Sequence, residues 1–163
     1  MSGAASGDLL ISPATAEDVP GIVSLIGRVY AEYGFVYEPR VEVPDLFDFA
    51  AHYAEPRGGF FVVRNANAIV GSIGVERLDD RSAELHRLYL DTDQRGRGTG
   101  RALMEAGIDW CRARGIGHVI LWSDTRFDLA HQLYARMGFA RTGERTMVGD
   151  VNNSREYRFE RQV

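Results

Sequence analysis

A run of glycines and arginines at residues 91–101 has the composition of an anion-binding loop. It reads Asp-Thr-Asp-Gln-Arg-Gly-Arg-Gly-Thr-Gly-Arg and lies between a predicted strand and a predicted helix. The first N–H groups of a helix have no partner within that helix, and glycines let the backbone approach a ligand closely. With the charges of Arg95, Arg97 and Arg101 added, the segment predicts a site for a pyrophosphate.

Two common phosphate-binding patterns do not fit this loop. A dinucleotide-binding G-x-G-x-x-G pattern that begins at Gly96 has Arg101 at its last position, and one that begins at Gly98 has Leu103 there. All 19 basic residues are arginines, so the lysine of a G-x-x-x-x-G-K-[ST] loop has no candidate. The loop therefore belongs to another class of phosphate binder.

Hydrophobic spacing predicts the elements that position this loop. Thr15 and Asp18 form a capping pair before a helical series at residues 19–30, which Gly34 ends. Three strand-like runs, at residues 59–63, 68–78 and 83–90, predict an antiparallel meander. The other predicted elements are a strand at 9–11, a helix at 44–53, a helix that contains 103–111, a strand at 118–122, a helix at 130–137 and strands at 139–148 and 154–161.

The element order β-α-α-β-β-β-α-β-α-β-β predicts a mixed α/β (α+β) fold. We expect a single domain over residues 8–163, with a central, mostly antiparallel mixed sheet and helices on both faces, after a disordered tail at 1–7. The 163 residues are 45% apolar, which is ordinary globular composition.

Composition and charge also narrow the expected partners. The formal net charge of −4 gives no support for nucleic-acid binding. Without a basic signal segment or a long apolar run, the chain is expected to be cytoplasmic and to bind no membrane. Its single cysteine, Cys111, excludes a disulfide framework, and no metal site is expected.

Two motifs in order resemble the GNAT superfamily of acyl-CoA-dependent N-acetyltransferases. The first is Arg95-x-x-Gly98-x-Gly100 after Leu88-Tyr-Leu90, and the second is Ala130-His-Gln-Leu-Tyr-Ala-Arg-Met-Gly-Phe139. The resemblance is strongest from Gly58 to Phe139, and the element order matches as well. It implies a GNAT-like domain that uses acetyl-CoA as its acyl-donor cosubstrate.

The resemblance also implies which residues hold the coenzyme. The backbone of residues 88–90 is expected to pair with pantetheine, and the loop amides to hold the pyrophosphate. Many members have an asparagine seven residues before the motif tyrosine; Phe127 stands there, and Arg126 is expected to replace its contact. The implied coenzyme-binding residues are Leu88, Tyr89, Leu90, Arg95, Gly96, Arg97, Gly98, Thr99, Gly100, Arg101 and Arg126.

Three side chains are candidates for catalysis. The resemblance implies that Tyr134 protonates the leaving thiolate, although its place on an apolar helical stripe also fits core packing. Strand alternation places Glu84 and His86 on the face of Leu88, so either is a candidate base for the amine; cross-strand pairing with an arginine is the alternative. The backbone N–H of Leu88 or Tyr89 is implied as the oxyanion donor.

Aromatic residues that follow the first helix are the candidate acceptor site. Tyr30, Tyr33 and Phe35, with Tyr37 beside them, are expected to form an acceptor wall or to pack in the core. Asp150, Asn152 and Asn153 lie at a predicted hairpin tip, which reaches the same cleft or stays solvated.

The expected function is transfer of an acetyl group from acetyl-CoA to a primary amine of a small molecule, by direct attack in a ternary complex. Cys111 lies on an apolar helical face, which disfavours an acyl-cysteine intermediate. The alternatives are a catalytically silent acyl-CoA-binding sensor and a nucleotide-phosphate binder without acyl chemistry. A homodimer is expected.

Overall fold

Seven strands form one sheet in the computed structural model, which describes residues 9–163; the predicted tail at 1–7 lies outside them. The strands are β1 (Ile11–Pro13), β2 (Gly58–Asn65), β3 (Ala68–Arg77), β4 (Ser82–Leu90), β5 (His118–Asp124), β6 (Ala140–Thr146) and β7 (Arg155–Gln162). Their order is β1-β2-β3-β4-β5-β7-β6, and within the described chain β4–β5 is the one parallel pair. The predicted meander is β2–β3–β4.

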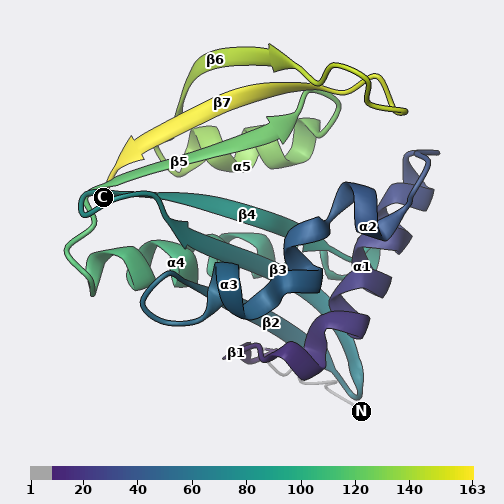
Figure 1. The fold of residues 1–163 in the computed structure, drawn as a ribbon, viewed down its shortest axis with the longest axis horizontal. Helices are drawn as coiled ribbons and strands as arrows, with labels where there is room; N and C mark the ends of the chain where they lie inside the picture. Colours follow the sequence, from purple (N-terminus) through teal and green to yellow (C-terminus); the bar gives the residue numbers. More distant parts are fainter. Residues whose placement is uncertain (1–8) are drawn as a thin grey trace, which may run out of the picture.

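Helices cover both faces of this sheet (Figure 1). They are α1 (Val19–Glu32), α2 (Pro39–Glu42), α3 (Phe49–Tyr53), α4 (Thr99–Arg112) and α5 (Asp128–Arg136). In the view of Figure 1, α1, α2 and α3 lie in front of the sheet, and α4 and α5 lie behind it. The predicted fold class is confirmed. No helix within residues 9–163 has the length and hydropathy needed to cross a membrane.

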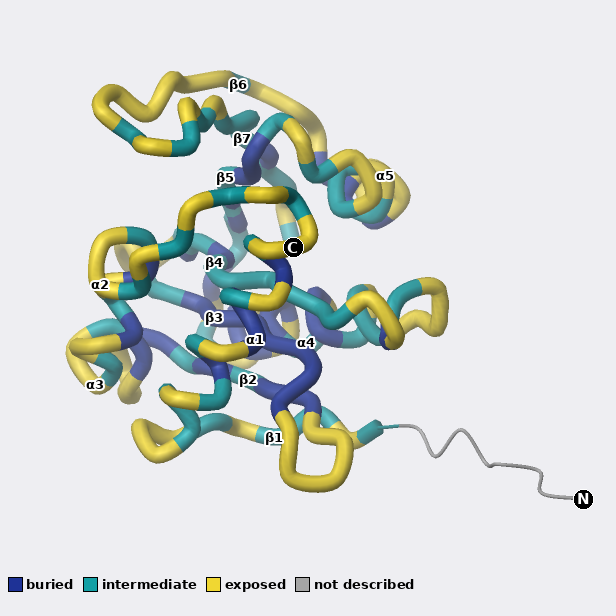
Figure 2. Tube along the Cα trace, turned by 90° about the vertical axis from the view of Figure 1, so that its right-hand side faces the viewer, coloured by how far each residue is buried: buried dark blue, intermediate teal, exposed yellow. Residues whose placement is uncertain are grey.

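Two apolar clusters, one on each face, hold the helices to the sheet. On the α1 face, Ile22 and Leu25 pack in one cluster with Val62 of β2. On the α4 face, Leu103 and Ile108 pack in the other. Figure 2 shows buried backbone concentrated in the middle of the sheet, while β6 at its edge is almost wholly exposed.

The N-terminal half differs from the sequence prediction in two places. The first strand begins at Ile11 rather than residue 9, because its pairing with β2 starts there. The helix predicted at 44–53 is a 3₁₀ helix at Pro44–Asp48 followed by α3, and α2 precedes it. A residue before proline avoids the α conformation, and Val43 accordingly has φ −132° and ψ 53°, which breaks the helix.

The beginning of α1 agrees with the sequence. The backbone N–H of Thr15 donates to Asp18 Oδ2 at 2.9 Å, which closes the predicted capping box. After α1, Gly34 has φ +69°, a left-handed conformation that suits glycine and ends the helix.

Strand β4 is irregular at the point where it meets the loop and α4. It pairs with β5 only over Ser82–Leu85, so the two strands diverge beyond that point, as Figure 1 shows. On its other side the register jumps from Gly74↔His86 to Ser72↔Tyr89, which leaves an extra residue in β4. Arg87 has φ +56° at this bulge, and its carbonyl accepts a 2.7 Å hydrogen bond from the Ser72 hydroxyl.

The bulge corrects one prediction about side-chain direction. Alternation had placed Glu84 and His86 on the face of Leu88. The inserted residue shifts the alternation by one, so Tyr89 shares their face, and Leu88 packs with the α4-side cluster instead.

Candidate active site

Two cavities meet where β4 and β5 diverge. The β4–β5 cavity, of about 330 Å³, lies between the two strands and is lined in part by the β6–β7 hairpin loop (residues 147–154). The loop cavity, of about 380 Å³, runs from β4 along residues 95–101 to α5. Both volumes suit small molecules. Four residues border both cavities: Leu88, Tyr89, Phe127 and Ala130.

Leu88 at this junction has unusual backbone surroundings. Neither Arg87 nor Leu88 has a register partner in β3, and the pairing of β4 with β5 has already ended at Leu85. Leu88 therefore lies where the regular pairing of β4 with both neighbouring strands is interrupted, at the border of the two cavities.

The loop cavity is lined by the glycine–arginine segment. Gly96 and Gly98 have φ +74° and +81°, and a Cβ on either would meet nothing within 4 Å, so the space beside the backbone is open. Gly98 is the N-cap of α4, whose first N–H groups have no helical partner. The segment thus presents free donors to the cavity.

Most of the predicted coenzyme residues line this cavity, and three do not. Those that line it are Leu88, Tyr89, Leu90, Arg95, Gly96, Gly98, Gly100 and Arg101. Arg95 also bonds the carboxylate of Glu32 and the carbonyl of Leu90, which fixes the start of the loop. Arg97 and Thr99 do not line it.

Arg126 lies away from the loop cavity. Its guanidinium pairs with Asp124 at 2.8 Å, bonds the carbonyl of Asn152 and the hydroxyl of Ser154, and covers the ring of Phe35 at 4.1 Å. It therefore holds the hairpin loop rather than replacing the contact of the missing asparagine.

Arg136 is a lining residue that sequence reasoning missed. It extends from the end of α5 into the loop cavity near Arg101. Its position in the second motif, two residues after Tyr134, is the signal that could have identified it. It adds a second positive charge to this part of the cavity.

Glu84 and His86 both line the β4–β5 cavity. Burial raises the pKa of Glu84 to about 7 and lowers that of His86 to about 4. His86 Nδ1 lies 3.4 Å from Glu84 Oε2, and no arginine lies within 4.0 Å of Glu84 in residues 9–163, so the alternative of an arginine pair does not hold. Glu84 is thus a carboxyl that titrates near neutral pH.

Tyr134 combines the two roles considered for it. It is 4% exposed and packs against Phe159 in the core, with its ring centroid 5.2 Å away, yet it also lines the β4–β5 cavity. Burial raises the pKa of its hydroxyl well above the ordinary value, and Ser123 offsets part of this by hydrogen bonding. The hydroxyl stays protonated at neutral pH.

The aromatic cluster divides between the two cavities. Tyr30 and Phe35 line the β4–β5 cavity, whereas Tyr33 lines the loop cavity. Phe127 contacts Tyr33 and Phe35 with ring centroids 4.9 and 6.2 Å apart, at the junction. Tyr37 lines neither cavity, and its hydroxyl donates to the carbonyl of Val23.

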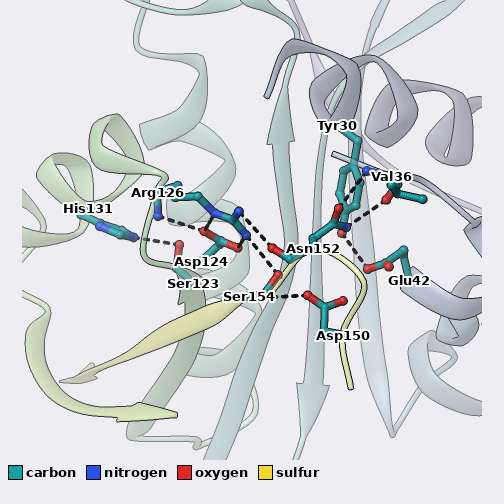
Figure 3. A network of polar contacts seen from close by, with 10 residues as sticks. All are labelled: Tyr30, Val36, Glu42, Ser123, Asp124, Arg126, His131, Asp150, Asn152 and Ser154. Atoms are coloured by element: carbon teal, nitrogen blue, oxygen red, sulfur yellow. Dashed lines mark hydrogen bonds and ion pairs between the residues drawn. The ribbon is translucent and has the colours of Figure 1, made fainter. Parts of the chain in front are cut away.

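The hairpin loop contributes part of the lining of the β4–β5 cavity, and polar contacts hold it to Arg126 and Val36 (Figure 3). The side-chain amide of Asn152 makes two hydrogen bonds to the backbone of Val36. The Val36 N–H donates to Asn152 Oδ1 at 2.8 Å, and Asn152 Nδ2 donates to the Val36 carbonyl at 2.9 Å. The sequence left open whether this tip reaches the cleft. Asp150 and Asn152 do line the cavity, and Asn153 does not.

A charged group under β4 fixes the bulge. Asp45 binds the Arg87 guanidinium through both of its oxygens and accepts a hydrogen bond from the Tyr53 hydroxyl. A bidentate pair of this kind restricts Arg87 to one orientation. The 3₁₀ helix that carries Asp45 therefore supports the part of β4 where the two cavities meet.

Comparisons with known proteins agree with this architecture. Among solved structures, a GNAT-family acetyltransferase from Staphylococcus aureus Mu50 is similar with a TM-score of 0.81 and 22% identity, over 94% of this chain and 98% of that one. Ard1 from Thermoplasma volcanium is similar with a TM-score of 0.77 and 23% identity, over 94% and 97%. At these identities the likeness concerns the fold.

Curated relatives match part of the chain. N-acetylaspartate synthetase from Danio rerio is 33% identical over 102 residues, which are 61% of this chain and 36% of that protein. Mycothiol acetyltransferase from Thermobispora bispora is 35% identical over 89 residues, 51% of this chain and 30% of that protein. The chain spans less than half the length of these relatives.

The family model described as "Acetyltransferase (GNAT) family" matches residues 26–139, which include the second half of α1, the meander, the glycine–arginine segment and the second motif. The match covers well over half of the 163 residues, and it includes the four residues that border both cavities. The chain belongs to the acetyltransferase (GNAT) family.

Proposed function

We propose that this protein transfers an acetyl group from acetyl-CoA to a primary amine of a small molecule, by direct attack in a ternary complex. One observation carries the proposal: the two cavities meet at the bulged segment of β4, and Glu84 and Tyr134 face the same cavity. A donor in one cavity and an acceptor in the other can therefore touch at Leu88.

The loop cavity fits the coenzyme. Open space beside Gly96 and Gly98, the unpaired amides at the start of α4 and the charges of Arg101 and Arg136 suit a diphosphate with a further phosphate. When bound, acetyl-CoA supplies a thioester carbonyl for acyl transfer. The N–H of Leu88 is the group we assign to the oxygen of that carbonyl, where one such donor contributes roughly 10²–10³ in rate.

Glu84 is the residue we assign as base. Its pKa of about 7 lets it be ionised at neutral pH and still accept a proton from the amine. His86, with a pKa of about 4, is neutral at that pH and lies 3.4 Å from Glu84 without a charge of its own.

Tyr134 is the residue we assign as acid. Its hydroxyl remains protonated and faces the cavity, so it is able to give a proton to the leaving thiolate. Starting from the neutral amine, whose ammonium has already lost one proton to solvent, the C–N bond forms and the C–S bond breaks. One amine proton goes to the Glu84 carboxylate and the thiolate receives the Tyr134 proton. Release of the Glu84 proton to water and uptake of a proton from water by Tyr134 return both residues to their starting states.

Two further observations support direct attack on a small acceptor. Cys111 is fully buried, lines neither cavity, and burial raises the pKa of its thiol to about 11, so it is a poor nucleophile. Asn152, which lines the β4–β5 cavity, is fixed by its two hydrogen bonds to Val36, and the cavity volume of about 330 Å³ suits a small acceptor.

Release of free thiol from acetyl-CoA in the presence of a panel of small amines tests the proposal. Binding of acetyl-CoA is measured separately by calorimetry. Amine-dependent thiol release is expected. Tight coenzyme binding without release for any amine would favour the silent acyl-CoA sensor, and protection by a simple nucleotide but not by the pantetheine arm would favour the nucleotide binder.

A further inference from the structure

Carboxylates outnumber arginines around the β4–β5 cavity. Three arginines are each paired with a carboxylate, in the pairs Arg87–Asp45, Arg126–Asp124 and Arg145–Glu156. Three carboxylates that line the cavity have no arginine within 4.0 Å in residues 9–163, namely Glu42, Glu84 and Asp150. Since Glu84 is assigned to the base, two negative charges are left over.

Glu42 and Asp150 come from separate elements and face the same space. Glu42 ends α2 and accepts a 3.4 Å hydrogen bond from the Tyr30 hydroxyl; Asp150 belongs to the hairpin loop and accepts the Ser154 N–H at 2.9 Å. Burial and the charge of Asp150 both raise the pKa of Glu42, so the two carboxylates repel each other. Figure 3 shows them near Tyr30 and the loop.

This carboxylate pair lies apart from the base. Asp150 is the carboxylate whose charge acts on Glu42, whereas Glu76 and Glu156 are those that act on Glu84. Glu84 sits on the paired part of β4, opposite Ile120 of β5. The base and the carboxylate pair therefore belong to different elements around one cavity: Glu84 contacts His86 within β4, whereas Glu42 contacts Tyr30 of α1 and Asp150 contacts Ser154.

We propose that the acceptor carries a second cationic group, so that one amine reacts beside Glu84 while an ammonium or guanidinium is held between Glu42 and Asp150. This inference rests on the proposed function and narrows its substrate to diamines and related amines with two charges. Tyr30 and Phe35 line the same cavity and suit the alkyl segment that joins the two charged groups.

The test compares acceptors that differ in one charge. Thiol release is measured with α,ω-diaminoalkanes, with n-alkylamines of equal chain length and with ω-amino carboxylates. For the wild type we expect kcat/KM of the best diamine to exceed that of its monoamine by about 10- to 100-fold, as hydrogen bonds to charged groups contribute. The amino carboxylates are expected to be poorer than the monoamines.

Variants then assign the preference to the two carboxylates. In Glu42→Gln/Asp150→Asn the ratio of diamine to monoamine is expected to fall to less than about threefold. The matched control, Glu38→Gln/Asp48→Asn, removes two exposed carboxylates of the same region that line neither cavity, and it should keep the wild-type ratio.

The outcomes distinguish failure of this inference from failure of the proposed acetyl transfer on which it rests. Equal kcat/KM for diamines and monoamines in the wild type, or a ratio that survives Glu42→Gln/Asp150→Asn, would overturn the two-charge acceptor while amine acetylation stands. Absence of thiol release with every amine, with acetyl-CoA bound, would instead overturn the proposed function.

Discussion

Replacing Glu84 with glutamine is expected to stabilise the folded protein at alkaline pH and to remove most of its catalysis. Burial raises the pKa of this carboxyl from 4.5 to about 7. The carboxyl of Glu84 therefore ionises at lower pH in the unfolded chain than in the folded one. Each unit of difference between its two pKa values corresponds to about 1.4 kcal/mol of folding free energy. Ionised Glu84 then costs the folded state about 3 kcal/mol above pH 7 and almost nothing below pH 4.5.

The glutamine variant lacks this cost because it does not ionise. The difference in free energy of unfolding, variant minus wild type, should thus rise between pH 4.5 and 7 and stay constant above. The side chain is 19% exposed, so water reduces the penalty, and we expect a gain of about 1–3 kcal/mol at pH 8. For a chain of this size this is a gain of roughly 2–12 °C in Tm.

Thermal unfolding of both proteins over this pH range, without coenzyme, measures the difference. Other titrating groups are common to the two chains and cancel. Glu17→Gln, which removes an exposed carboxyl, is the control and should show no such pH dependence. A Tm difference that is the same at pH 5 and pH 8 would refute the raised pKa.

Kinetics of the same preparations test the catalytic part of the reasoning. Wild-type kcat/KM should rise with pH through about 7 as Glu84 loses its proton. The variant should not show this rise with pH, and its turnover should be slower by about 10²- to 10⁴-fold, which is the usual contribution of a general base. A variant that keeps both the pH dependence of kcat/KM and the wild-type rate would show that another group takes the amine proton.

Three other substitutions test the remaining assignments. Tyr134→Phe should lower kcat by at least about tenfold with little change in the KM for acetyl-CoA, and an unchanged kcat would leave Tyr134 with packing alone. Gly98→Val should weaken coenzyme binding at least about tenfold in calorimetry, whereas Gly115→Val, at a glycine with similar φ outside both cavities, should not; equal losses would contradict the loop assignment. Asn152→Ala removes both hydrogen bonds to Val36 and should raise the acceptor KM roughly 3- to 30-fold with little effect on acetyl-CoA, and an unaltered acceptor KM would exclude a role in closing the cavity.

Regular, local signals in the sequence were enough for much of the fold. The meander has alternating apolar runs and short turns, and the 3₁₀ turn Ala16–Asp18 that leads into α1 carries the capping box, so each is specified by neighbouring residues. The broken helix before β2 was not predicted, because Pro39 and Pro44 each begin a helical turn and only the structure shows that they do so separately.

The candidate site was predictable where it lies on one stretch of chain. Five of the seven residues 95–101 of the glycine–arginine segment line the loop cavity, since they are close together in sequence. The bulge at Arg87 depends on Ser72 and Asp45, from two other elements, and alternation within β4 alone could not reveal it. The contact of Asn152 with Val36 joins residues 116 positions apart, which no local pattern encodes.

The parting of β4 from β5 also bears on how two substrates enter one covered site. The halves of the sheet share four residue pairs at one end, Ser82–Leu85 with His118–Leu121. At the opposite end side-chain contacts join them, with Asn152 bonded to Val36, Arg126 over Phe35 and Phe127 against Tyr33. An unbroken sheet would have used this edge of β4 to pair with β5, whereas here the edge beyond Leu85 is left for two substrates to approach from opposite directions.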